Sequence, residues 1–147
     1  MADKWAFSSI LAEDRRLQRS SVIVRGLWAA CLLGAGANHA RILIEHGLLW
    51  DYGGVSVASA AYWSSLTILD PFAAVLLFVR PKMGIPMTIV LITTNVLHNL
   101  ALTAMRAPEG EFLIRAASDP FLVSQIGFMV FVPPTTRAAW KAIRSQS

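Results

Sequence analysis

Four apolar stretches, separated by short polar segments, dominate the chain. They lie at about residues 22–44, 55–79, 85–104 and 116–132. Each is within the roughly 17–25 residues that a helix needs to cross the hydrocarbon core of a bilayer. The pattern therefore predicts an all-α fold, a bundle of four transmembrane helices that forms a single integral membrane domain over residues 1–147.

Glycine and proline mark the expected ends of these spans. Gly53-Gly54 separates the first span from the second, the segment from Pro81 to Pro86 separates the second from the third, and Pro133-Pro134 follows the fourth. The link between the second and third spans is very short. We therefore expect these two helices to form an antiparallel hairpin.

The first twenty residues mix acidic with basic side chains, whereas a cleavable signal peptide passes quickly from a basic region into a short apolar core. We therefore expect no such signal. Phe7, Ile10, Leu11 and Leu17 share one helical face. This face favours an N-terminal interfacial helix that lies along the membrane surface.

The composition agrees with a membrane protein. Hydrophobic residues make up 55% of the chain and charged residues 15%, whereas an ordinary soluble domain has about 25% charged residues. The net charge of +4 raises nucleic-acid binding as an alternative, but the basic residues punctuate apolar runs and form no stripe, so we expect no nucleic-acid partner. Cys31 is the single cysteine and lies in an apolar run, which excludes an intrachain disulfide and favours a packing role.

The distribution of Lys and Arg predicts the orientation in the membrane. Of the 13 Lys and Arg residues, only Arg41, Arg106 and Arg115 lie on the side that carries the links after the first and third spans. Since cytoplasmic flanks carry the excess of basic residues, we predict a multi-pass membrane protein with both termini in the cytoplasm.

Asp70, near the middle of the second predicted span, is the strongest candidate for a functional residue. A charged group in the hydrocarbon costs at least about 3 kcal/mol, so it needs a partner or a purpose. The second span descends towards the cytoplasm and the third returns, which places Asp70 and Asn95 near the midplane. His39 and His98 fall at similar depth in the outer half. We expect a cavity that opens outward, with Asp70 at its floor.

Further polar and aromatic residues are expected to line this cavity. Asn95, His98 and Asn99 share one face of the third span because their spacing is i, i+3 and i+4. The expected acid–base residues are Asp70, His39, Glu45 and His98, and the expected ligand-binding residues are Trp63, Asn95, Asn99, Asn38, Trp50 and Gln125. We expect no metal site and no cofactor.

Two other interpretations of the same residues remain open. Polar side chains in spans often act only as hydrogen bonds between helices, worth about 0.6 kcal/mol each, which would suit an accessory or assembly subunit of a larger membrane complex. His39 and His98, at matching depth, would also provide axial ligands for a haem or chlorin. Ala30, Gly34 and Asn38, spaced by four, predict a seam of small residues that packs against another helix.

Three segments carry a resemblance to a known family. Residues 69–80, LDPFAAVLLFVR, have a proline and a terminal arginine, His39 is followed by Glu45, and Val132-Pro133 precedes a basic tail. With the short basic link between the second and third spans, these features resemble the emopamil-binding or EXPERA-type proteins, which include sterol isomerases and the sigma-2 receptor. Two features depart from that family: Ser64 stands in the region of its second-span Glu, and no Trp accompanies Gln125.

The resemblance implies a four-span bundle with a pocket for a lipid-like molecule. We therefore expect a small polytopic membrane protein that binds a sterol-like or terpenoid-like lipid in an intramembrane cavity. Isomerisation of that molecule by proton transfer is the expected chemistry, since moving a double bond needs a proton donor and a proton acceptor. The expected partner is a membrane lipid or hydrophobic small molecule, with a homo-oligomer or a larger membrane complex as the alternative.

Overall fold

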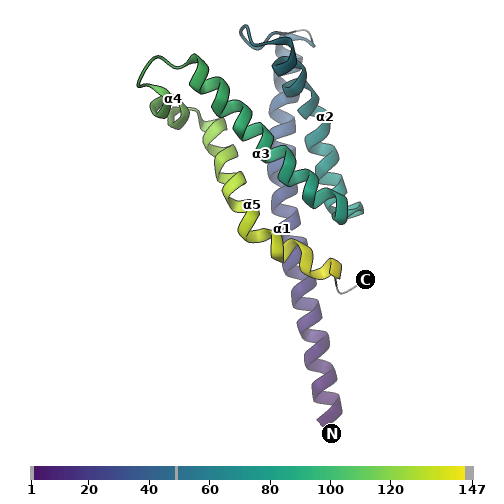
Figure 1. The fold of residues 1–147 in the computed structure, drawn as a ribbon. Helices are drawn as coiled ribbons and strands as arrows, with labels where there is room; N and C mark the ends of the chain where they lie inside the picture. The colour runs from purple at the N-terminus through teal and green to yellow at the C-terminus, as the bar shows by residue number, and fades with distance from the viewer. Residues whose placement is uncertain (1, 49, 145–147) are drawn as a thin grey trace. The chain divides into compact units, whose positions relative to one another are not determined.

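The computed structural model describes residues 2–48 and 50–144, with side chains from Glu13 onward except those of residues 142 and 144. Its helices are α1 (Ala2–His46), α2 (Val57–Val79), α3 (Pro81–Arg106), α4 (Phe112–Ser118) and α5 (Pro120–Arg144) (Figure 1). The described residues contain no strand. The predicted all-α fold is therefore confirmed.

Three helices are long and apolar enough to cross a membrane: α1 from Glu13 to His46, α2 and α3. Helices α4 and α5 meet the same criterion only together, and they are bent by 86° relative to each other. The fold therefore agrees with a multi-pass membrane protein of three spans, or of four if the bent pair counts as one.

The single helix predicted over residues 116–132 is wrong, because the chain breaks at Asp119. The side chain of this residue accepts hydrogen bonds from the backbone N–H groups of Phe121, at 2.9 Å, and Leu122, at 3.1 Å. This is an N-terminal helix cap. Pro120 then occupies the first helical position, where its missing N–H costs nothing. The two residues together start a new helix, α5.

Pro133-Pro134 does not end this helix as predicted, since both prolines lie inside α5. Pro133 and Pro134 have no N–H to donate to the carbonyls of Met129 and Val130, four residues earlier. The hydroxyl of Thr135 donates to the carbonyl of Phe131 at 2.7 Å, and that of Thr136 donates to the carbonyl of Val132 at 2.8 Å. These hydroxyls bond to carbonyls other than the two that the prolines leave without a donor, and α5 nevertheless continues to Arg144.

Helix α1 has no break between the N-terminal segment and the first span. The side chains of Phe7, Ile10 and Leu11, on which the interfacial face was predicted, lie outside the described residues. Further along, Cys31 is exposed, so the predicted packing role is wrong. Ala30 is exposed as well, and a Cβ added at Gly34 would meet no described atom within 4 Å. The predicted small-residue seam is therefore not packed against another described segment.

The chain divides into two compact units. The middle unit is Leu27–Thr88, which contains the end of α1, the connecting loop, α2 and the start of α3. The terminal unit combines the N-terminal residues up to Gly26 with the chain from Ile89 onward. Each has buried apolar side chains of its own: Trp28, Leu32, Leu66, Leu77 and Ile85 in the middle unit, and Val96, Leu122, Val132 and Ala139 in the terminal unit.

Two glycines set the closest helix contacts of the middle unit. A Cβ at Gly36 of α1 would lie 2.9 Å from Cδ of Pro71 in α2. A Cβ at Gly84 of α3 would lie 2.8 Å from the carbonyl oxygen of Leu76 in α2, closer than real Cβ atoms come. Only Arg80 separates α2 from α3. Helix α3 therefore turns back along the end of α2, as the short link predicted.

In the terminal unit, Ser21 ties the first part of α1 to the last part of α5. Its hydroxyl donates to the carbonyl of Ala139 at 2.7 Å, and both residues are fully buried. Nε of Arg25, one turn later on α1, donates to the carbonyl of Ser21 at 3.3 Å. Ala139 lies beyond Pro133-Pro134 in α5, so its bond with Ser21 depends on the continuation of α5 past these prolines.

Candidate functional site

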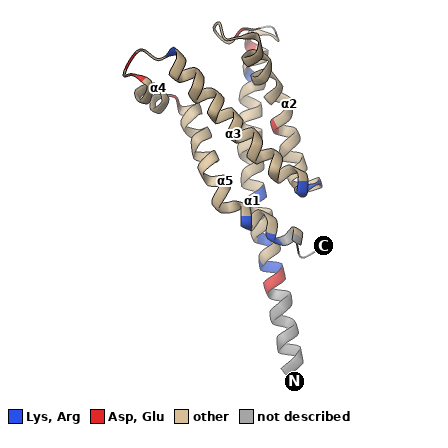
Figure 2. Ribbon diagram, in the orientation of Figure 1, with Lys and Arg blue, Asp and Glu red and all other residues tan. Residues whose placement is uncertain are grey.

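Asp70 lies at the contact between α1 and α2 in the middle unit. It is 4% exposed and is the one charged residue of α2 (Figure 2). A Cβ at Gly36 would stand 3.4 Å from its Cβ. Within the described part of the chain, Oδ2 of Asp70 has no hydrogen-bond partner. Because leaving a buried acceptor unsatisfied costs about 1–3 kcal/mol, this side chain is a candidate for binding a ligand.

His39 lies one helical turn after Gly36 on the same face of α1. It is 7% exposed, and its Nδ1 has no partner among the described residues. The loop after α1 reverses the chain, so α2 runs back along α1. One turn after Gly36 on α1 therefore corresponds to one turn before Asp70 on α2. That position is Thr67.

Thr67 is a site residue that the sequence patterns did not single out. Its Oγ1 is buried and has no partner in the described structure. Pro71 follows four residues later inside α2, and proline has no N–H to donate to the carbonyl at i−4. The carbonyl of Thr67 is thus without its helical hydrogen bond. In the sequence, Thr67 could have been recognised as a site residue because it lies four residues before a Pro in an apolar span.

His39, Thr67 and Asp70 are named the polar site here. Each contributes one buried atom without a described partner: Nδ1, Oγ1 and Oδ2 respectively. The surrounding side chains of this helix pair are apolar and buried, among them Leu32, Leu66 and Ala73. This part of the helix contact therefore suits a ligand that carries a hydrogen-bonding group, and it does not suit a purely apolar ligand.

Glu45 and Asn38, both predicted as site residues, bind Arg41 instead. Nη1 of Arg41 lies 3.0 Å from one carboxylate oxygen of Glu45 and 3.1 Å from the other. Its Nη2 donates to Oδ1 of Asn38 at 3.2 Å. Arg41 and Glu45 are exposed. The structure therefore does not bring Glu45 or Asn38 into the polar site.

The predicted ligand-binding residues Trp50 and Trp63 belong to a row of aromatic rings at the loop between α1 and α2. The rings of His46 and Trp50 stack at 4.0 Å, those of Trp50 and Tyr52 lie 4.7 Å apart, and those of Tyr52 and Trp63 lie 5.1 Å apart. The Tyr52 hydroxyl is 3.3 Å from Oγ of Ser64. These contacts fix the loop on the start of α2.

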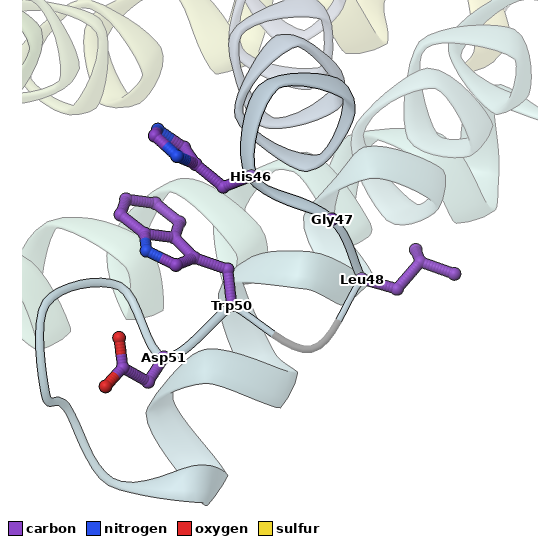
Figure 3. Close-up of a pocket in the computed structure, with 5 residues that line it drawn as sticks. All are labelled: His46, Gly47, Leu48, Trp50 and Asp51. Atoms are coloured by element: carbon purple, nitrogen blue, oxygen red, sulfur yellow. The ribbon is translucent and has the colours of Figure 1, made fainter.

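A hollow of about 780 Å³ lies beside this loop (Figure 3). It is lined by His46, Gly47, Leu48, Trp50 and Asp51. Oδ1 of Asp51 accepts a hydrogen bond from the N–H of Gly53 at 3.0 Å, which holds the turn. The hollow includes no residue of the polar site, so it is not the cavity that the sequence predicted above Asp70.

Three predicted ligand-binding residues form an amide network in the terminal unit. Nδ2 of Asn99 donates to Oδ1 of Asn95 at 3.3 Å and to Oε1 of Gln125 at 2.7 Å. The second bond joins α3 to α5. Asn95 is buried and the other two are partly buried. These contacts match the interpretation of the amides as hydrogen bonds between helices.

His98, the fourth predicted acid–base residue, is half-buried on α3 in the terminal unit. The hypothesis that it binds a haem or chlorin together with His39 remains a prediction. Within the described chain, no three or more His, Cys, Asp or Glu side chains come together in a way that would hold a metal ion.

Comparison of this chain with family models, curated proteins and solved structures found no match. The resemblance to EXPERA-type proteins therefore remains a prediction. The functional interpretation depends on the geometry of the polar site.

Proposed function

We propose that this protein binds a hydrophobic molecule of sterol or terpenoid size at the contact between α1 and α2. The polar site holds the polar group of that molecule, and the apolar side chains around it contact the hydrocarbon body. The observation that carries the proposal is the set of three buried polar atoms, on His39, Thr67 and Asp70, without partners among the described residues. Without a ligand that bonds to them, buried polar atoms of this kind are costly in a membrane.

The proposal includes a four-span topology with both termini in the cytoplasm. In this arrangement α4 and α5 together form the fourth span, with its bend at Asp119. The basic residues support the orientation, because Arg80, Lys82 and the C-terminal end of α5 carry positive charge on one side. The loop with Asp51 and the loop with Glu109 are then on the opposite side.

The chemistry proposed for this site is the movement of a carbon–carbon double bond. Asp70 and His39 are the two groups of the polar site that exchange protons. One donates a proton to a carbon of the double bond, and the other removes a proton from a neighbouring carbon, so that the molecular formula and the oxidation state are unchanged. Glu45 is not included, because it is paired with Arg41 on an exposed face.

A second function is favoured by the amide network of Asn95, Asn99 and Gln125. Polar contacts of this kind stabilise helix packing and need no ligand. A protein with only such contacts would be an accessory or assembly subunit of a larger membrane complex. It would retain only bulk lipid after purification.

The deciding experiment is extraction of the protein purified in mild detergent, followed by mass spectrometry of the extract. We expect one hydrophobic molecule in stoichiometric amount from the wild type and a loss of at least tenfold in Asp70→Asn. Glu109→Gln, at an exposed loop position, is the matched control and should retain the molecule. Bulk lipid alone from the wild type, or full retention in Asp70→Asn, would refute the proposal.

A further inference from the structure

The polar site has an excess of oxygen acceptors on two adjacent turns of α2. Oγ1 of Thr67 and Oδ2 of Asp70 are buried and have no described partner. The carbonyl oxygen of Thr67 adds a third acceptor, because Pro71 has no N–H to donate to it. Thr67 and Asp70 are three residues apart and share one face of the helix. These oxygens therefore lie on adjacent turns of one face of α2.

In the middle unit, neither Arg41 nor Arg80 is placed to neutralise Asp70. Arg41 is bound to Glu45. Arg80 follows Asp70 by ten positions along the sequence, which corresponds to about 15 Å at the rise of an α-helix. His39 makes neither a hydrogen bond nor an ion pair with Asp70 in the described structure. Within the middle unit, an ionised Asp70 is therefore not neutralised by Arg41, Arg80 or His39.

The ligand types indicate a sodium ion. Carboxylate, hydroxyl and backbone carbonyl oxygens are the donors that hard cations prefer, and Pro71 leaves the carbonyl of Thr67 without its helical donor although α2 continues through it. A divalent cation would leave an uncompensated charge beside a single carboxylate in the membrane. We propose that Thr67 and Asp70 bind one Na⁺ at the proline of α2.

This inference goes beyond the proposed function, because the ion requires Asp70 and Thr67 but no lipid. The bound ion would keep Asp70 ionised. The two proposals are separable because one concerns an inorganic ion and the other an extracted organic molecule.

Thermal unfolding of the purified protein in detergent tests the sodium site. The midpoint is measured in NaCl and in choline chloride at equal ionic strength, over a range of Na⁺ concentrations. We expect Na⁺ to raise the midpoint by several degrees in a saturable manner. Asp70→Asn should abolish the increase, Thr67→Val should require at least tenfold more Na⁺, and Glu109→Gln should behave as the wild type.

Equal midpoints in NaCl and choline chloride for the wild type would overturn the sodium site, as would an undiminished increase in both Asp70→Asn and Thr67→Val. If Asp70→Asn does not fold, the Thr67→Val variant alone tests the sodium site, since this change removes one oxygen that binds Na⁺ and keeps the shape of the side chain. A wild type that retains a stoichiometric lipid but shows no sodium effect would refute only the sodium site. A sodium effect without a retained lipid would refute only the proposed lipid binding.

Discussion

Gly36 of α1 lies against Pro71 of α2 so closely that a Cβ on the glycine would stand 2.9 Å from the proline Cδ. The same Cβ would be 3.4 Å from Cβ of Asp70. This contact determines the register of the two helices, and the register places His39 level with Thr67. Small residues at such contacts let membrane helices approach closely.

The first prediction concerns Gly36→Leu. The larger side chain cannot fit against Pro71, so the helices must separate, at a cost of about 1–3 kcal/mol. The measurement is the thermal unfolding midpoint in detergent, which should fall by several degrees. Gly34→Leu is the control, because a Cβ there meets no described atom within 4 Å. Equal decreases in the two variants would contradict the close contact at Gly36.

The second prediction concerns Asp70→Leu, in which an apolar group replaces the buried carboxyl. Removing an unsatisfied acceptor relieves about 1–3 kcal/mol, so we expect the variant to be more stable than the wild type when both are freed of ligand and kept without sodium. The same variant should retain no lipid. Lower stability than the wild type under these conditions would show that Asp70 has a structural partner.

A third prediction concerns Asn99→Leu in the amide network. The change removes the hydrogen bonds to Asn95 and Gln125, each worth about 0.6 kcal/mol on average in membrane proteins. We expect a decrease of about 1 kcal/mol in stability, and lipid retention unaffected.

The control for Asn99→Leu is Ser124→Ala, because among the described residues the hydroxyl of Ser124 bonds within its own helix, to the carbonyl of Phe121. A double-mutant cycle with Gln125→Leu would measure the coupling between α3 and α5. No coupling energy in that cycle would show that the bond of 2.7 Å between Asn99 and Gln125 contributes nothing to stability.

The fourth prediction concerns topology. In a Cys31→Ser background, single cysteines at Asp51, Lys82 and Glu109 are labelled in intact cells with a reagent that does not cross the membrane. The positive-inside distribution predicts labelling at positions 51 and 109 and none at position 82. Labelling of position 82 with protection of the other two would reverse the proposed orientation. Labelling of position 51 but not of position 109 would contradict a span formed by α3.

The sequence alone determined the three segments, in α1, α2 and α3, that are helical and apolar enough to cross a membrane. Hydrophobic runs of sufficient length form helices in lipid because every backbone hydrogen bond must be made within the segment. Glycine determined the break at Gly53-Gly54, where both residues have positive φ angles of 75° and 83°. The sequence also marked Asp70 as the unusual residue, since a carboxyl group in an apolar run is costly wherever the neighbouring helices lie.

Only the tertiary structure decided which polar residues meet. The close fit of Gly36 against Pro71 sets the register that places His39 of α1 level with Thr67, one turn before Asp70, and a register between helices cannot be derived from the period of either helix alone. Glu45 does not take part in the site, because it forms an ion pair with Arg41, one turn before it on α1. The prolines of α5 were misleading as well, since the helix continues through them to Arg144 and Ser21 of α1 binds Ala139 beyond them.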